Sequence, residues 1–110
     1  MILRFRRINK DIFEAIKRGN KRIETRAATK KYKNIKTGDK VILSCGRDKF
    51  EKHVKKAKIY KKIGSLLRKY KPTELNPHVK TAKEIETMLY SFPGYKTKIN
   101  KCGIIALELE

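Results

Sequence analysis

The sequence predicts an α+β fold that is mainly β: a mixed-sheet, partly closed β-barrel of five to six strands, with about three short helices at its ends. Short apolar segments typical of strands recur along the chain, and turn residues separate them. Segments with helical spacing are inserted among these strands without regular alternation, which argues against a parallel βαβ sheet. The length of 110 residues is typical of one domain, so we expect residues 1–110 to form a single unit.

The first quarter of the chain is expected to form a strand, a helix and a second strand. Residues 2–8 hold apolar side chains with arginines between them, as in a strand. Asn9 can cap the helix that follows, and Gly19 can end it. This helix, over residues 10–18, carries an apolar stripe at helical spacing that consists of Ile12, Phe13 and Ile16. The segment KRIETR, residues 21–26, is expected to be the next strand.

The middle of the chain is expected to form a loop and a long hairpin. Residues 27–37 are polar and rich in lysine, as in a surface loop. Residues 38–45 contain three consecutive apolar residues, which favour a strand buried on both faces. After a turn, residues 50–62 are expected to be extended. The spacing from Val54 to Ile59 breaks the alternation of apolar and polar residues, which indicates a β-bulge.

The last part of the chain is expected to form two helices and a closing strand. Residues 63–70 place apolar side chains at helical spacing, and a proline follows them. Residues 73–80 are expected to connect this helix to a second one, which begins with a T-x-x-E capping box at Thr81 and ends at a Pro-Gly pair. Residues 95–101 are expected to form a turn or a short strand. The alternation in residues 103–110 predicts a final strand.

The net charge indicates an anionic partner. The chain carries 30 Lys and Arg against 11 Asp and Glu, so its formal charge is +19. Two long segments, residues 25–38 and 52–73, contain no acidic residue. This distribution favours a nucleic acid, with a basic surface that has no partner and an acidic protein partner as the alternatives. The lysines expected to contact phosphates are Lys30, Lys31, Lys33, Lys36, Lys55, Lys56 and Lys58.

Other classes of function find little support in the sequence. The two cysteines form no zinc-binding pair and the two histidines are isolated, so we expect neither a metal site nor a cofactor. The longest apolar run is too short to span a membrane, and the N-terminal residues lack the features of a secretory signal. We therefore expect a cytoplasmic protein, as a monomer, in which Cys45 and Cys102 are buried thiols rather than a disulfide or reactive groups.

The segment KRIETR concentrates charge on one short strand. Side chains alternate between the two faces of a strand, so Glu24 and Arg26 are neighbours if Ile23 points into the core. They then form either an exposed ion pair of little energetic value or a carboxylate held by arginine at the mouth of a pocket. In the second case Lys21, near the start of the strand, can swing toward Glu24.

Four segments, GNKRIETR, IKTGDKVIL, KIYKKIGSLL and GIIALELE, resemble the activating signal cointegrator homology (ASCH) domain. The residues that match the family pattern in order and spacing are Gly19, Lys21, Glu24, Arg26, Gly38 and Asp39. The resemblance covers nearly the whole chain and implies a PUA-like β-barrel, a fold shared with domains that modify or read RNA. It also implies that Lys21, Glu24 and Arg26 line a cleft beside the barrel.

The same resemblance raises an enzymatic alternative. Some small members of the family that are similar to this chain act as amidohydrolases on 4-acetylcytidine, with a lysine, a threonine nucleophile and a distant glutamate. Lys21 matches the lysine, but Glu24 occupies the threonine position and Thr25 is offset to the opposite strand face. Either Glu74 or Glu84 could supply the distant glutamate. In an amidohydrolase or a ribonuclease, Lys21 and Glu24 are the expected catalytic residues.

The sequence therefore predicts an RNA-binding protein, with the enzyme as the alternative. The lysines hold the backbone of a single-stranded or structured RNA without reading its sequence. A splayed-out base or nucleotide enters the cleft, where Glu24 can accept hydrogen bonds from a base amino group and Arg26 can bind a phosphate or a base edge. Tyr32 lies among lysines and is expected to stack on a base.

Overall fold

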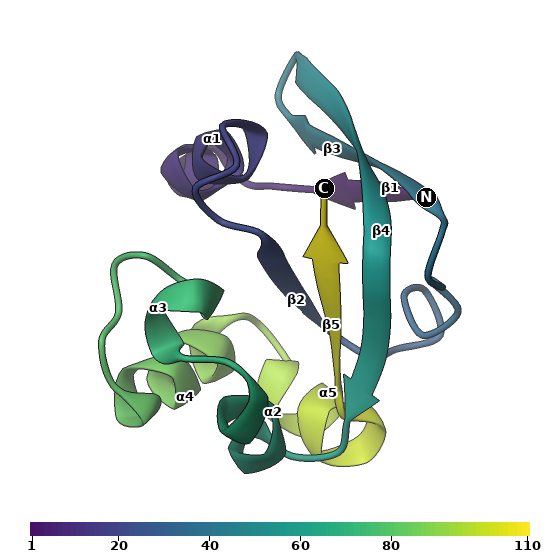
Figure 1. The fold of residues 1–110 in the computed structure, drawn as a ribbon. Helices are drawn as coiled ribbons and strands as arrows, with labels where there is room; N and C mark the ends of the chain where they lie inside the picture. Colours follow the sequence, from purple (N-terminus) through teal and green to yellow (C-terminus); the bar gives the residue numbers. More distant parts are fainter.

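The computed structural model describes all residues, 1–110, and contains one curled five-stranded sheet (Figure 1). The strand order is β1-β3-β4-β5-β2, with β1 parallel to β3 and the other neighbours antiparallel. The sheet curls into half a barrel whose free edges are β1 and β2, which confirms the predicted mixed sheet. The strands are β1 (Ile2–Arg4), β2 (Ile23–Ala27), β3 (Lys40–Cys45), β4 (Asp48–Tyr60) and β5 (Ile104–Leu109).

Five α-helices accompany the sheet, where the sequence predicted about three. The helical elements are η1 (Arg7–Asn9, a 3-10 helix), α1 (Lys10–Lys17), α2 (Ile63–Lys69), α3 (Pro72–Leu75), α4 (Ala82–Ser91) and α5 (Tyr95–Cys102). The predictions of α1, α2 and α4 are confirmed, including the cap at Thr81, whose side chain accepts a hydrogen bond from the Glu84 N–H. The strand predicted for residues 2–8 ends early because the chain turns into η1.

Two other segments differ from the prediction. α3 lies in the segment predicted as a connector, where Pro72 occupies the first turn and suits a helix start. α5 replaces the turn or short strand predicted for residues 95–101. Its single buried residue is Ile99, which packs into a core that the linear sequence does not reveal. Cys102, at the end of this helix, is exposed rather than buried as predicted, whereas Cys45 is buried.

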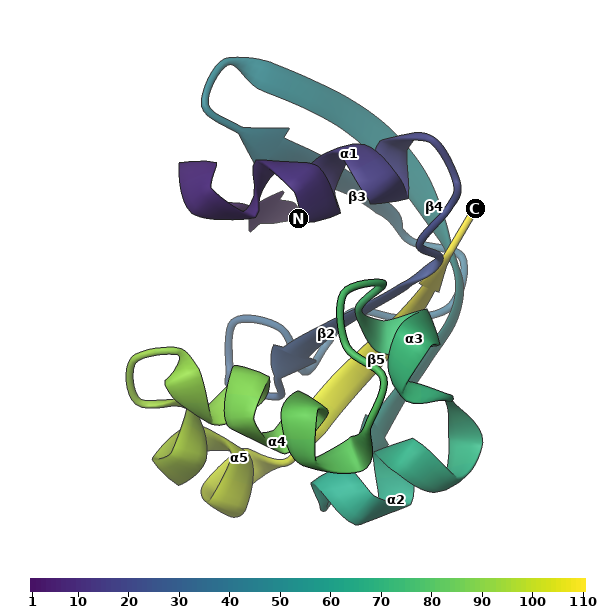
Figure 2. The ribbon, with the colours of Figure 1, turned by 90° about the vertical axis from the view of Figure 1, so that its left-hand side faces the viewer.

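The core has two parts, one on each face of β5. On one face, Ile105 and Leu107 pack with Phe13 of α1 inside the half-barrel. On the other face, Ile104 and Ala106 pack against residues of α2, α3, α4 and α5. Figure 2 shows α1 over one end of the sheet and α3, α4 and α5 over the other, with β2 between them. This arrangement places β2, which carries KRIETR, between the two groups of helices.

β4 carries the predicted bulge. Its register against β5 shifts between Val54 and Lys56, which lies within the interval where the alternation breaks. β5 is buried on both faces, and β4 and β2 pair with its two edges along almost its full length. None of the helices has the length and the apolar composition that crossing a bilayer requires.

Candidate functional site

The candidate site is centred on β2. Pairing with β5 places Glu24 opposite Leu107, a residue of the half-barrel interior. Glu24 and Arg26 share this strand face, and Ile23 lies on the other face, as the alternation predicted. Lys21 precedes the strand by two residues, close enough for its long side chain to reach Glu24. The strand pairing and the position of Lys21 therefore bring the charged side chains of Lys21, Glu24 and Arg26 together.

These side chains form one buried network, the Lys–Glu–Arg cluster (Lys21, Glu24 and Arg26). The Lys21 Nζ lies 3.2 Å from Glu24 Oε1, and the Arg26 Nε and Nη2 lie 3.3 and 3.0 Å from Glu24 Oε2. The backbone N–H of Thr25 also donates to Glu24 Oε1, at 3.1 Å, and Lys21 donates to the Ile23 carbonyl. The side chains of the cluster are 3%, 9% and 12% exposed, so this is not a solvated surface pair.

Aromatic rings hold the guanidinium group of Arg26 in place. Its Cζ lies 4.9 Å from the ring centroid of Phe5 and 5.6 Å from that of Tyr32. Lys31 also approaches the Tyr32 ring, with its Nζ at 5.3 Å from the centroid. The predicted base-stacking residue Tyr32 is thus half-buried and already in contact with two cations.

Burial and charge act in opposite directions on the pKa values of the cluster. Burial lowers the pKa of Lys21, because desolvation of the ammonium outweighs the attraction of Glu24. Burial alone would raise the pKa of Glu24, but the charges of Lys21 and Arg26 bring it below its ordinary value. Burial alone would also lower the pKa of Arg26, but the combined attraction of Glu24, Tyr32 and Tyr95 raises it. The proton of Lys21 is therefore easier to remove than that of a surface lysine.

A cavity of about 340 Å³, which we call the β2 cavity, opens beside the cluster. All three cluster residues line it, together with the exposed side chains of Arg4 and Arg6. Its apolar and aromatic lining comes from segments around β1, α1, α3, α4 and α5 and consists of Phe5, Ile12, Leu75, Met88, Leu89, Phe92 and Tyr95. A mostly apolar enclosure with a few convergent polar groups is typical of a small-molecule site.

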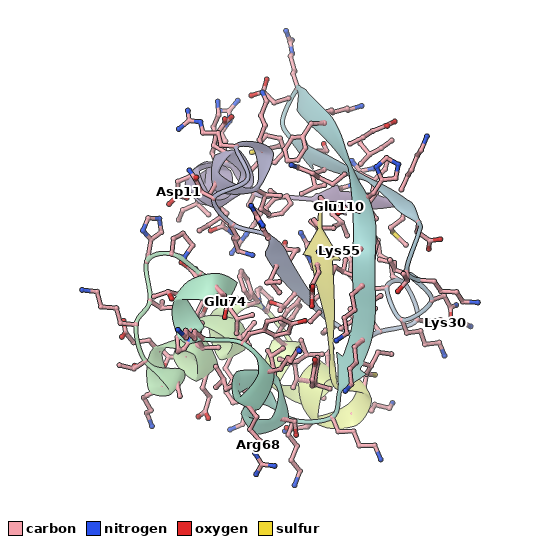
Figure 3. All side chains as sticks on the ribbon, in the orientation of Figure 1. Asp11, Lys30, Lys55, Arg68, Glu74 and Glu110 are labelled. Atoms are coloured by element: carbon pink, nitrogen blue, oxygen red, sulfur yellow. The ribbon has the colours of Figure 1, made fainter.

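Lys21 also lines a second cavity of about 570 Å³, which we call the C-terminal cavity. Figure 3 labels three of its charged residues, Lys55, Glu74 and Glu110. The hydroxyl group of Tyr70 donates to Glu108 Oε2 there, at 2.6 Å, and burial raises the Tyr70 pKa. The buried side chain of Lys21 therefore lines both cavities, and the other lining residues of each cavity come largely from different segments of the chain.

The two glutamates considered for a hydrolase lie in different places. Glu74 lines the C-terminal cavity together with Lys21. Glu84 is exposed on α4, where it bonds with the cap residue Thr81, and it lines neither cavity. Thr25 lines the β2 cavity although it faces the other side of β2 from Glu24. No group of three or more His, Cys, Asp or Glu residues is placed to hold a metal ion.

The predicted phosphate-binding lysines do not all converge on the cluster. Four of them lie exposed on the loop between β2 and β3, outside both cavities: Lys30, Lys31, Lys33 and Lys36. On β4, Lys55 and Lys58 are exposed and Lys56 is half-buried. Of these, Lys55 shares the C-terminal cavity with Lys21. Figure 3 shows Lys30 on the opposite side of the molecule from Glu74.

Sequence reasoning missed several residues of the β2 cavity. Arg4 and Arg6 were assigned only to a strand, and Phe92 only to a helix face. Tyr95 was placed in a turn or a strand, whereas it begins α5 and is half-buried in the cavity lining. The only signal for the arginines was their alternation with apolar residues near the N-terminus. Nothing in the linear sequence joins these segments to β2.

Comparison with known proteins finds similar structures but no activity. No family model matches the chain, and no curated protein matches it. The crystal structure of hypothetical protein PH0355 is similar, with a TM-score of 0.79 and 27% identity over 100% of this chain and 98% of that chain. The solution NMR structure of protein PF0455 from Pyrococcus furiosus is also similar, with a TM-score of 0.72 and 27% identity over 100% of this chain and 96% of that chain. These likenesses support the compact α+β fold along the whole length of the chain.

Proposed function

We propose that this protein binds RNA in the cytoplasm as an ASCH-type domain of the PUA-like superfamily. The observation that carries the proposal is the convergence of Lys21, Glu24 and Arg26 at the β2 cavity. The resemblance to the ASCH domain implied that these residues line a cleft, and alternation on β2 alone accounts only for the Glu24–Arg26 pair. An aromatic cavity beside buried cations, in a chain of charge +19, suits a polyanion that can present one unstacked base.

The proposed binding has two parts with different roles. The lysines of the loop between β2 and β3, together with those of β4, contact phosphates and give affinity without selectivity. The β2 cavity binds an unstacked base or nucleotide and supplies the selectivity among nucleic acids. RNA is favoured over duplex DNA because its loops and single strands present unpaired bases.

A binding panel tests this proposal. The purified protein is titrated with a folded tRNA, a single-stranded RNA and a DNA duplex at about 150 mM salt. We expect submicromolar binding of one or both RNAs and weaker binding of the duplex. Replacing the cavity lysine, Lys21→Met, should weaken RNA binding more than Lys49→Met, an exposed β4 position outside both cavities. Weak and equal binding of all three nucleic acids would refute a dedicated RNA site.

One observation favours an amidohydrolase as the second candidate. Lys21, with its lowered pKa, shares the C-terminal cavity with Glu74, and a lysine of this kind can act as a base. Incubation with 4-acetylcytidine, followed by chromatography for cytidine and acetate, tests this candidate. In a hydrolase, Lys21→Met should lower turnover by orders of magnitude, whereas a binder should lose only part of its affinity. Gel analysis of the RNA in the same mixtures tests a ribonuclease.

A further inference from the structure

The carboxylate of Glu24 has no free acceptor position. Its Oε1 accepts from Lys21 and from the Thr25 N–H, and its Oε2 accepts from the Nε and the Nη2 of Arg26. A carboxylate offers about four lone-pair positions, and four donors occupy them. A ligand in the β2 cavity therefore cannot donate a hydrogen bond to Glu24. It can bond only to Lys21 and Arg26, the two cations that Glu24 positions.

The donors that remain free belong to Lys21 and Arg26. An ammonium has three N–H groups, and Lys21 uses two of them, on Glu24 and on the Ile23 carbonyl. A guanidinium has five, and Arg26 uses two on Glu24. No acidic residue other than Glu24 lines the cavity. The buried end of the cavity therefore presents N–H donors, which are complementary to a ligand with carbonyl or anionic oxygen atoms.

The walls of the cavity suit a flat ring. The rings of Phe92 and Tyr95 lie with their centroids 5.2 Å apart, and Phe5 lines the same cavity. Aromatic side chains stack on unpaired bases whatever their sequence. A volume of about 340 Å³ is at the lower end of the range for small-molecule sites, which fits one base or one nucleotide.

Two unpaired arginines lie at the exposed side of this cavity. Neither Arg4 nor Arg6 forms an ion pair or a side-chain hydrogen bond, and both are exposed. The Cζ of Arg6 lies 5.8 Å from the ring centroid of Phe92, so its guanidinium sits beside an aromatic wall. Arginine recognises phosphate through paired N–H groups.

We propose that the β2 cavity binds one nucleotide whose base carries the O4 carbonyl of uracil or the O6 carbonyl of guanine, and that Arg4 and Arg6 hold its phosphate. The base carbonyl accepts from Lys21 and Arg26, and the ring lies against Phe92 and Tyr95. This inference rests on the proposed RNA binding and names the ligand of the same site. The nucleotide is either free or an unstacked member of an RNA strand.

Titration with mononucleotides tests the inference. We expect UMP and GMP to bind at least about tenfold more tightly than CMP and AMP, because cytosine and adenine carry an amino group at the position where uracil and guanine present the O4 or O6 carbonyl to the free donors. Uridine should bind more weakly than UMP, and inorganic phosphate alone should not reach the affinity of UMP. Equal affinity for the four nucleotides, or for UMP and uridine, would overturn the proposal.

A matched pair of variants separates the arginine site from general charge. Arg4→Ala and Arg6→Ala should each weaken UMP binding by about tenfold and leave uridine binding unchanged. Arg47→Ala removes the same charge at an exposed turn outside both cavities and should leave both ligands unaffected. All three positions are exposed, and a thermal melt verifies that the variants fold. If the three variants behave alike toward UMP, the arginines do not hold its phosphate.

A short oligouridine distinguishes the two sources of the nucleotide. Binding that is at least about tenfold tighter than that of UMP identifies an RNA strand, since the flanking phosphates add contacts. Equal affinity identifies the free nucleotide, and either result supports the cavity assignment. Base-selective UMP binding without RNA binding would refute the proposed function alone. RNA binding without base selectivity or arginine dependence would refute the nucleotide site alone.

Discussion

Glu24 is a buried carboxylate in a strongly basic protein, and its role follows from its partners. Lys21 and Arg26 flank it and reverse the effect of burial on its pKa. Each cation would be an uncompensated buried charge without it. Glu24 therefore acts as a positioning residue that fixes two donors at the edge of the β2 cavity. The contribution of Glu24 to the stability of the fold and its contribution to ligand binding can be measured separately.

Replacing this carboxylate should destabilise the protein strongly. Glu24→Gln keeps the size of the side chain but leaves Lys21 and Arg26 without a counter-charge, at a cost of about 3–5 kcal/mol in the free energy of unfolding. Urea unfolding at about pH 7 measures this loss. Glu51→Gln, at an exposed β4 position, is the matched control and should change stability by no more than about 0.5 kcal/mol.

The pH dependence of the same variant gives an independent check. The pKa of Glu24 in the folded protein lies below its ordinary value of 4.5, so the folded state holds the proton less readily than the unfolded state. The stability that Glu24 contributes is fully present above this value and is lost as the pH falls through the lower, folded-state pKa. The stability gap between the parent protein and Glu24→Gln should therefore shrink on acidification, and parallel curves would contradict the role given to Glu24.

The candidate site was predictable in part. Period-two alternation placed Glu24 and Arg26 together on one strand face and Ile23 on the other. Lys21 lies on the opposite side of that alternation, and it reaches Glu24 only because it precedes the regular strand. The aromatic and arginine lining comes from segments that meet only in the folded chain, so no local pattern could reveal it.

At the scale of elements, prediction succeeded where a segment has a strong apolar period. α1 and α4 each bury a regular stripe, and β5 is an apolar segment that is buried on both faces. α5 was missed because its polar sequence buries only Ile99, and tertiary packing rather than periodicity makes it helical. Glycines mark both ends of this helix: Gly94 and Gly103 have φ values of 74° and 83°.

Gly103 joins α5 to β5 and should tolerate no side chain. Its backbone lies in a region that favours glycine, and a Cβ atom there would lie 2.6 Å from the Tyr60 carbonyl oxygen. Strain and close contact together predict that Gly103→Ala lowers the free energy of unfolding by about 2–4 kcal/mol. The matched control is Gly64→Ala in α2, where nothing lies within 4 Å of the added atom. This control should raise stability by about 0.5–1 kcal/mol, and thermal melts of both variants measure the contrast.

At the scale of the whole molecule, the charge is large and mostly uncompensated. A formal charge of +19, with histidine counted as neutral, is carried on a body of about 31 × 28 × 25 Å, with three ion pairs of Lys or Arg with Asp or Glu. Three of the eleven acidic residues line the C-terminal cavity, and none of the lysines on the loop between β2 and β3 lines it. Such a surface repels itself and attracts polyanions.

If the proposed RNA binding takes place, this charge distribution should make it depend steeply on salt. If six lysines or arginines contact phosphates, a plot of log K against log salt should have a slope of about −4, because each contact contributes about −0.7. A variant with Lys30, Lys31, Lys33 and Lys36 all changed to glutamine should flatten the slope by as much as about 3. Fluorescence anisotropy across a salt series measures both slopes.

The same loop variant separates the two parts of the proposed binding surface. None of its four positions lines the β2 cavity, so the affinity for UMP at a fixed salt concentration should match that of the parent protein. An unchanged salt slope would mean that this loop does not contact the RNA backbone. A parallel loss of UMP binding would mean that the loop and the cavity are not independent. The surface charge would then act on every anion alike, without a separate site for the nucleotide.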